Sequence, residues 1–247
     1  MAIFGVSVSI VIVALGGGFS GSSISFFNPP NASNLWTVGQ NIQSGTTMNY
    51  SLTRIGSHIS PWSSLGQHSS LIDSLVSIQF NEDEGIGGSS NDNDNNDNNW
   101  KTVIHVVNGT ITTTAPPIAS SKEETVYLSK QQLTNEGSVS QDFIPYYEPI
   151  ESSLLEVRDI AQGPNYLVVG AQWNSIIGGI TTIPVKITAQ EKIETNAGTF
   201  NTYVLSYIMG SKTSRIWISH DVPLPIKAEV YNAQGQLQYT YTLLFYK

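Results

Sequence analysis

A strict alternation of apolar and polar residues near the C-terminus constrains the fold more than any other feature of the chain. Between residues 237 and 245, apolar positions fall on one side of an extended chain and polar positions on the other. The apolar side holds Leu237, Tyr239, Tyr241, Leu243 and Phe245. Similar runs begin at residue 183, and turn residues at 196–198 and 232–235 separate them. The pattern predicts consecutive antiparallel strands, whose apolar face must be covered by a helix, a second sheet, a ligand or a partner.

Further strands are expected in the first half of the chain. Residues 36–51 are rich in Thr, Gly and Asn with scattered apolar residues, residues 70–80 end in an apolar-polar alternation, and KTVIHVV follows at 101–107. Asn108-Gly109 suits the positive φ angles of a two-residue type I′ turn, which predicts a hairpin into the TITTT run that comes next. The acidic stretch 81–99 has almost no core residues, so we expect it to be a mobile loop.

Two helices are also expected. A capping-box pattern at 129–132 predicts a short helix that ends near Gly137. A longer helix should have Pro149 in its first turn and end before Gly163, since apolar residues between 150 and 161 recur at helical spacing. The charged residues of this helix, interpreted as its solvated face, are Glu151, Glu156, Arg158 and Asp159. The predicted fold class is mainly β (α+β), a curved antiparallel sheet with one principal packed helix.

The N-terminal segment predicts a membrane anchor. Residues 2–19 carry no charge, and eighteen residues in a helix span about 27 Å, close to the hydrocarbon thickness of a bilayer. The alternative is a cleaved signal peptide, although no Lys or Arg precedes Arg54. We therefore expect a transmembrane anchor or signal-anchor at 1–19 that contacts the lipid bilayer, a linker at 20–34, and a β-rich domain at 35–247. The expected location is the cell membrane, single-pass, with the main domain extracytoplasmic.

Composition supports that location and excludes several kinds of function. Only 12% of residues are charged, and glycosylation sequons begin at Asn31, Asn49 and Asn108. The net charge of −8 disfavours nucleic acid as a partner, because phosphate backbones attract clustered Lys and Arg. The chain has no cysteine, which excludes disulfides, thiolate nucleophiles, iron–sulfur clusters and zinc ribbons. No cofactor is expected.

The C-terminal third resembles a known family. The runs EKIETNAGTFNTYVLSY, IWISHDVPLP and IKAEVYNAQGQLQYTYTLL are similar to strands of extracytoplasmic half-barrel proteins related to periplasmic lipoprotein carriers. The resemblance covers about residues 180–247 and carries no catalytic signature. It implies a curved sheet around a helix-lined hydrophobic cavity that can hold acyl chains.

No metal or catalytic motif is complete. Asp92, Asp94 and Asp97 approach the spacing of an EF-hand loop, but the positions for its glycine and its bidentate glutamate are wrong, so the loop is expected to bind cations weakly at most. The four histidines, His58, His68, His105 and His220, form no metal-binding pair at helical spacing. No nucleophile elbow, phosphate-binding loop or dinucleotide fingerprint is present.

The aromatic residues of the predicted strands are the remaining candidates for a site. Packing in the core is their default interpretation, but they line an apolar pocket if the concave side of the sheet is incompletely covered. The candidate ligand-binding residues are Tyr203, Tyr207, Trp217, Tyr239 and Tyr241. The sequence thus favours a non-enzymatic, membrane-anchored binding domain for an apolar ligand or a membrane-protein partner. The alternatives are a structural subunit of a membrane complex or pilin-like filament, and a hydrolase without a recognisable linear motif.

Overall fold

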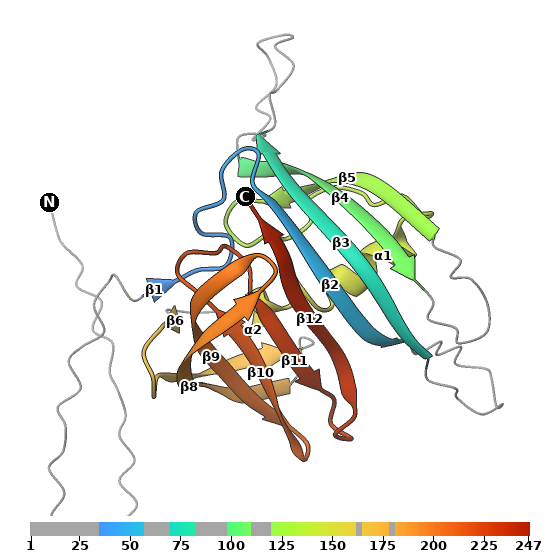
Figure 1. The fold of residues 1–247 in the computed structure, drawn as a ribbon. Coiled ribbons are helices and arrows are strands. Elements are labelled where there is room, and N and C mark those ends of the chain that lie inside the picture. Colours follow the sequence, from blue (N-terminus) through green and yellow to red (C-terminus); the bar gives the residue numbers. More distant parts are fainter. Residues whose placement is uncertain (1–34, 57–69, 83–97, 110–119, 162–164, 178–180) are drawn as a thin grey trace, which may run out of the picture. The chain divides into compact units, whose positions relative to one another are not determined.

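The structure of the protein, a computed structural model, describes residues 35–56, 70–82, 98–109, 120–161, 165–177 and 181–247 (Figure 1). In chain order its elements are β1 (Leu35–Trp36), β2 (Thr47–Gly56), β3 (Ser70–Glu82), β4 (Asn99–Gly109), β5 (Ser120–Ser129), α1 (Ile144–Glu151), α2 (Val157–Ile160), β6 (Asn165–Tyr166), β7 (Gln172–Ile177), β8 (Thr181–Thr195), β9 (Gly198–Met209), β10 (Lys212–Ile218), β11 (Lys227–Tyr231) and β12 (Leu237–Tyr246). The predicted mainly β fold with an antiparallel sheet is confirmed.

Ten strands form one antiparallel sheet in the order β5-β4-β3-β2-β12-β11-β10-β9-β8-β7 (Figure 1). Two meanders, β2 to β5 and β7 to β12, join where the last strand pairs with β2, with Tyr241 opposite Leu52 and Leu243 opposite Tyr50. β1 and β6 make a separate two-stranded sheet. The two ends of the domain sequence therefore meet in the middle of the large sheet.

One side of the sheet, here called the inward face, carries the core. A row of cross-strand neighbours crosses eight strands on this face, each pairing with the next: Ile187, Leu205, Ile216, Ala228, Tyr241, Leu52, Ser74 and Asn108. All but the last are buried. The other side, the outward face, carries the residues between them, so the period-two pattern separates two chemically different surfaces.

The sheet is strongly curved. β8 and β12 approach within 8 Å between Cα atoms although three strands separate them in the sheet, where flat strands would lie about 19 Å apart. Register shifts interrupt the ladders between Ile187 and Ala189 and between Leu243 and Phe245. Such bulges bend and twist a strand, so the curvature has a local cause.

One predicted side-chain direction in β12 is wrong because of the bulge after Leu243. Phe245 was expected on the apolar side with Leu243, but after the register shift it pairs with Asn49 and is 44% exposed. Tyr246 pairs with Met48 instead and packs against the core. One extra residue exchanges the two faces of a strand, and hydrophobic periodicity alone does not reveal it.

The predicted single helix from Pro149 to Ala161 is wrong. α1 begins at Ile144 and encloses Pro149, and a turn at 152–156 separates it from the four-residue α2. The hydroxyl groups of Ser152 and Ser153 donate to carbonyls four residues earlier, which weakens a helix at this point. Residues 153–155 are all buried, which one face of a straight helix cannot achieve.

Other predicted elements are also corrected. The helix at 129–137 is a turn without helix, and residues 37–46, expected in a strand, form turns between β1 and β2. Asn108 and Gly109 are not a hairpin turn, since both stay in β4 and pair with Ser74 and Asp73 of β3. A flanking ladder on both sides of β4 outweighs the local turn preference of Asn-Gly.

Several predictions fall outside the described residues. These are the anchor and linker at 1–34, the acidic loop apart from its ends in β3 and β4, and the TITTT run. In the ranges that the structure does describe, no helix has the length and apolar character needed to cross a membrane.

Candidate functional site

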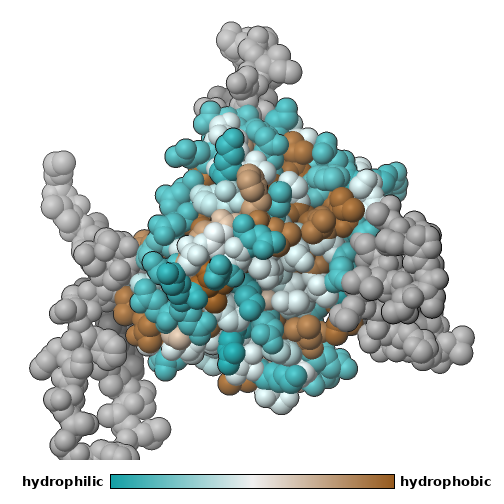
Figure 2. Space-filling view, in the orientation of Figure 1, coloured by the Kyte–Doolittle hydropathy of each residue, from teal (hydrophilic) through white to brown (hydrophobic). Residues whose placement is uncertain are grey.

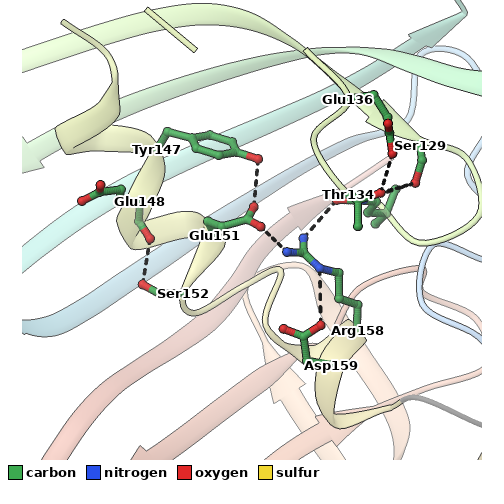
Figure 3. Close-up of polar contacts among 10 residues, drawn as sticks. Ser129, Thr134, Glu136, Tyr147, Glu148, Glu151, Ser152, Arg158 and Asp159 are labelled. Carbon is green, nitrogen blue, oxygen red and sulfur yellow. Dashed lines mark hydrogen bonds and ion pairs between the residues drawn. The ribbon is translucent and has the colours of Figure 1, made fainter. Parts of the chain in front are cut away.

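Arg158 lies at the centre of a polar network that joins the two helices to the turn after β5 (Figure 3). Its guanidinium forms an ion pair with Glu151, and the Tyr147 hydroxyl donates to the same carboxylate at 2.8 Å. The other Nη donates to the Leu133 carbonyl oxygen at 3.1 Å. Burial opposes the charge of Arg158, but the hydrogen bond to Glu151 and the charges of Glu151 and Asp159 outweigh it together, so the pKa of Arg158 lies above its ordinary value. The network fixes the position of the helices on the sheet.

The Arg158 bond also stabilises an unusual backbone. Leu133 has a φ of +55° and a fully buried side chain. A left-handed conformation costs a leucine about 1–2 kcal/mol. The Leu133 amide donates to the Ser129 carbonyl at 2.9 Å, and its own carbonyl accepts from Arg158, so both backbone groups hold this conformation.

A second polar cluster lies under the segment 152–161, here called the cover segment. The Tyr239 hydroxyl of β12 donates to the carboxylate of Glu156 at 2.8 Å. Burial raises the pKa of Glu156 to about 7, because no cation pairs with this carboxylate among the described residues and the bond from Tyr239 compensates only in part. Burial and the nearby Glu156 carboxylate likewise raise the pKa of Tyr207. The pKa of Glu156 therefore lies near neutral pH, well above the ordinary range of a glutamate.

Tyr241 completes this cluster. Its ring is 1% exposed, stacks on Tyr239 with centroids 6.0 Å apart, and meets Tyr50 edge to face at 5.8 Å. The Tyr50 hydroxyl donates to the Pro225 carbonyl at 3.0 Å, whereas the Tyr241 hydroxyl is buried without a hydrogen-bond partner in the described part of the chain. The inward face thus contains titratable groups at its centre.

The structure divides the five predicted ligand-binding aromatics between two faces. Tyr203, Tyr207, Tyr239 and Tyr241 are inward, and the last three are only 3%, 2% and 1% exposed. Trp217 is outward: it donates to the Glu191 carboxylate at 2.8 Å and lies under the Lys227 ammonium at 4.9 Å. The chain's own side chains cover the inward aromatics, so these five residues do not form one open surface.

Sequence reasoning missed Glu156. The predicted solvated face is wrong, because Glu151, Glu156, Arg158 and Asp159 are all partly buried and linked to neighbours. The break at 152–156 rotates Glu156 toward the sheet, a change that the helical pattern does not show. The one available signal was the position of Glu156 directly between buried Leu155 and Val157.

The structure does not test the predicted metal ligands, because Asp92, Asp94 and Asp97 lie outside the described residues, as do His58 and His68. Among the described residues, no three His, Cys, Asp or Glu side chains come close enough to hold a metal ion. His220 lies in a turn after β10, where its ring meets Tyr203 edge to face at 6.0 Å.

Two of the three predicted glycosylation sites lie inside the sheet, and Asn31 is outside the described residues. Asn49 is in β2 between β12 and β3, with its side-chain oxygen buried. The side-chain oxygen of Asn108 accepts a hydrogen bond from Ser74 at 2.7 Å. Strand interiors leave less room for a glycan than loops do.

The outward face carries an uncharged area over β4, β3, β2 and the end of β12, here called the outward patch. Its centre is a cross-strand pair, Leu75 and Val107, of which Leu75 is 54% exposed. Figure 2 shows hydrophobic residues gathered over β3 and β4. The patch consists of Val103, His105, Val107, Leu75, Ser77, Gln79, Thr47, Asn49, Ser51, Thr242 and Phe245. None of these residues carries a formal charge when the histidine is neutral.

Three solved structures show a distant likeness in fold, and no curated protein matches. A candidate lipoprotein from Parabacteroides distasonis is 14% identical over 86% of this chain and 99% of its own, with a TM-score of 0.34. A candidate exported protein with a YmcC-like fold from Bacteroides fragilis is 10% identical over 86% and 98%, with a TM-score of 0.30. MucB is 10% identical over 83% of this chain and 53% of its own, with a TM-score of 0.37.

The family comparison is more specific. It matches residues 119–244, from just before β5 to two residues before the end of β12, with proteins described as DUF3108-like. This match includes the cover segment, the Glu156 cluster and nearly all of the C-terminal meander, and it is not a match to the carrier family that the C-terminal strands resemble. Because it covers just over half of the chain, the protein belongs to the DUF3108-like family.

Proposed function

We propose that this protein is a non-enzymatic, extracytoplasmic binding domain that engages a polypeptide partner through the outward patch. In this proposal residues 1–19 anchor the chain in the cell membrane, residues 20–34 are a linker, and residues 35–247 are the binding domain. The carrying observation is the contrast between the two faces. On the inward face Tyr207, Tyr239 and Tyr241 are buried, whereas Leu75 and Phe245 are 54% and 44% exposed on an uncharged surface.

The chemistry of the patch suits a protein interface. The solvated face of an antiparallel sheet ordinarily carries charged side chains, whereas these strands present aliphatic groups with Ser, Thr and Asn between them. Interfaces have apolar centres depleted of charge and surrounded by polar groups. Burying one exposed leucine completely contributes roughly 1.5–3 kcal/mol, so Leu75 can supply a central contact.

The apolar-ligand alternative has less support. It requires the inward aromatics to line an accessible cavity, but Tyr207, Tyr239 and Tyr241 are covered by the chain's own side chains. A ligand there would need the cover segment to move. The low share of charged residues and the uncharged segment 2–19 support the extracytoplasmic, anchored part of the proposal.

Site-specific photocrosslinking in cells tests the proposal. A photoreactive amino acid replaces Leu75 in the full-length chain, and a matched probe replaces Ile208, which is 58% exposed on β9 and remote from the patch. We expect a protease-sensitive adduct of defined size from position 75 and not from position 208. The variant Val107→Lys should abolish the adduct, and Ile208→Lys should leave it unchanged.

Three outcomes would overturn the proposal or redirect it. Equal adducts from both positions, or an adduct insensitive to Val107→Lys, would show that the patch is not the contact surface. Native mass spectrometry that finds a mass excess removable by organic solvent, with no attached polypeptide, would support the apolar ligand instead. Filaments in electron micrographs would identify the partner as a second copy of the chain.

A further inference from the structure

We propose that the protonation of Glu156 controls how often the cover segment, residues 152–161, opens from the inward face. The proposal concerns the face opposite to the outward patch and does not depend on the proposed function. It rests on the arrangement of groups around a carboxylate that connects the segment to the sheet.

The segment is held to the sheet at Glu156, whose carboxylate is surrounded by phenols, and at Ile160, whose carbonyl oxygen accepts from Trp173 and Ser175 of β7. Of these contacts, the one at Glu156 involves a carboxylate. Glu156 accepts from Tyr239 of β12 at 2.8 Å, and the nearby titratable side chains of the sheet are Tyr207 and Tyr241. On its own segment the nearest charges are Asp159 and Arg158. The guanidinium of Arg158 is engaged by Glu151 and the Leu133 carbonyl, so it does not neutralise Glu156 directly.

Two further charges lie at the border of the cluster. Arg54 of β2 is opposite Tyr239 in the register, and Glu148 of α1 is the charge that acts on Arg54 most strongly. Neither forms an ion pair with Glu156 among the described residues. The closed segment therefore holds a carboxylate where ionisation is unfavourable.

The sign of the pH effect follows from linkage. In the closed state Glu156 keeps its proton up to about pH 7, whereas in an open segment its pKa returns toward the ordinary 4.5. Between these values the closed state binds more protons, so a rise in pH shifts the equilibrium toward opening, and below pH 4.5 the effect vanishes. The full difference in pKa corresponds to a factor of about 300 in the opening equilibrium.

The effect changes a small population and does not unfold the segment. Leu154, Leu155, Val157 and Ile160 are all at most 1% exposed and hold the segment more strongly than one carboxylate can loosen it. Rare opening would uncover Tyr207 and the other inward phenols. Acidification thus closes access to the inward face, and neutral to basic pH increases it.

Hydrogen exchange of the full-length protein tests this inference. The amides of Arg158, Asp159, Ile160 and Ala161 donate within the segment, so their protection reports its opening. After correction for the chemical exchange rate, we expect protection at 158–161 to fall by up to about 300-fold between pH 4.5 and 8. Amides in the middle of β3 and β4 should show no comparable change.

Matched variants separate Glu156 from other titrating groups. Glu156→Gln should remove the pH dependence at 158–161, whereas Glu148→Gln, which removes one exposed carboxylate from α1, should keep it. Tyr239→Phe removes the bond that lowers the pKa of Glu156, so the transition should move to higher pH. Protection independent of pH in the wild type, or a pH dependence that survives Glu156→Gln, would overturn the proposal.

Discussion

We predict that removal of the Tyr241 hydroxyl stabilises the protein, which is unusual for the loss of a polar group. The side chain is 1% exposed, and its hydroxyl is buried without a partner in the described part of the chain. A buried donor or acceptor that lacks a partner costs roughly 1–3 kcal/mol of desolvation free energy. Tyr241→Phe keeps the ring, and with it the stacking on Tyr239 and the edge contact with Tyr50, while it removes the unsatisfied group.

The expected result is a free energy of unfolding higher by roughly 1–3 kcal/mol. For a domain of this size that corresponds to an increase in Tm of about 2–12 °C. Urea denaturation followed by circular dichroism measures the change, and the slope of the transition should stay constant because the exposed surface does not change.

Tyr50→Phe is the matched control, since the two rings are neighbours and equally buried. The Tyr50 hydroxyl donates to the Pro225 carbonyl at 3.0 Å, so its removal leaves a buried acceptor without a donor. We expect Tyr50→Phe to lower the free energy of unfolding by roughly 1–3 kcal/mol. If both variants lose stability by similar amounts, the Tyr241 hydroxyl has a partner and the reasoning is refuted.

Three further predictions concern a turn and the two polar clusters. Gly210→Ala should lower the free energy of unfolding, measured in urea, by more than about 2 kcal/mol, because a Cβ there would lie 2.0 Å from the Ala233 carbonyl oxygen. Gly45 has a similar φ and no atom within 4 Å of its Cβ position, so the control variant Gly45→Ala should lower it by only about 1 kcal/mol. Glu156→Gln should raise the free energy of unfolding by up to about 3 kcal/mol at pH 8 and leave it nearly unchanged below pH 4.5, since the raised pKa weakens the wild type as pH rises to about 7. Arg158→Met should lower Tm, with a loss of about 2 kcal/mol, because the Glu151 carboxylate then loses its cation and the Leu133 carbonyl loses its donor from Arg158.

The C-terminal meander could be predicted from the sequence because one face of every strand is buried. In β12 the buried and partly exposed residues alternate from Tyr239 to Leu243 as the pattern indicates, whereas Leu237, beside a register shift, is only partly buried. The bulge after Leu243 could not be predicted, since it depends on how β12 and β2 pair across almost the whole chain. Alternation shows which residues share a face only while the register is unbroken.

Local preferences failed where tertiary pairing opposed them. Asn108-Gly109 favours a two-residue turn, but β3 and β5 continue the ladder beside it. The apolar stripe from Ile150 to Ala161 likewise favours one continuous helix. The chain forms two short helices instead, and the turn between them buries Leu154 and Leu155 together, which one straight helix could not do. In both places burial against distant strands decided the conformation.

The same wrong expectations about helices and strands led to wrong expectations about the candidate site. Glu156 was interpreted as a solvated residue because a continuous helix would turn it away from the stripe, and the turn at 152–156 brings it to Tyr239. Trp217 was grouped with the inward tyrosines because aromatic residues on neighbouring strands suggest one pocket. The register places it beside Lys227 and Val204 on the outward face instead.

The two proposals can be tested for coupling because they share a physical connection. Tyr239, the partner of Glu156, is in β12, which pairs with β2, and the outward patch extends across both strands. If partner binding changes the register or twist of this pair, it also changes the environment of Glu156. Linkage then requires that the affinity for the partner depends on pH and that Glu156→Gln removes this dependence. If the affinity for the partner does not change between pH 5 and 8, the sheet instead separates its two faces completely.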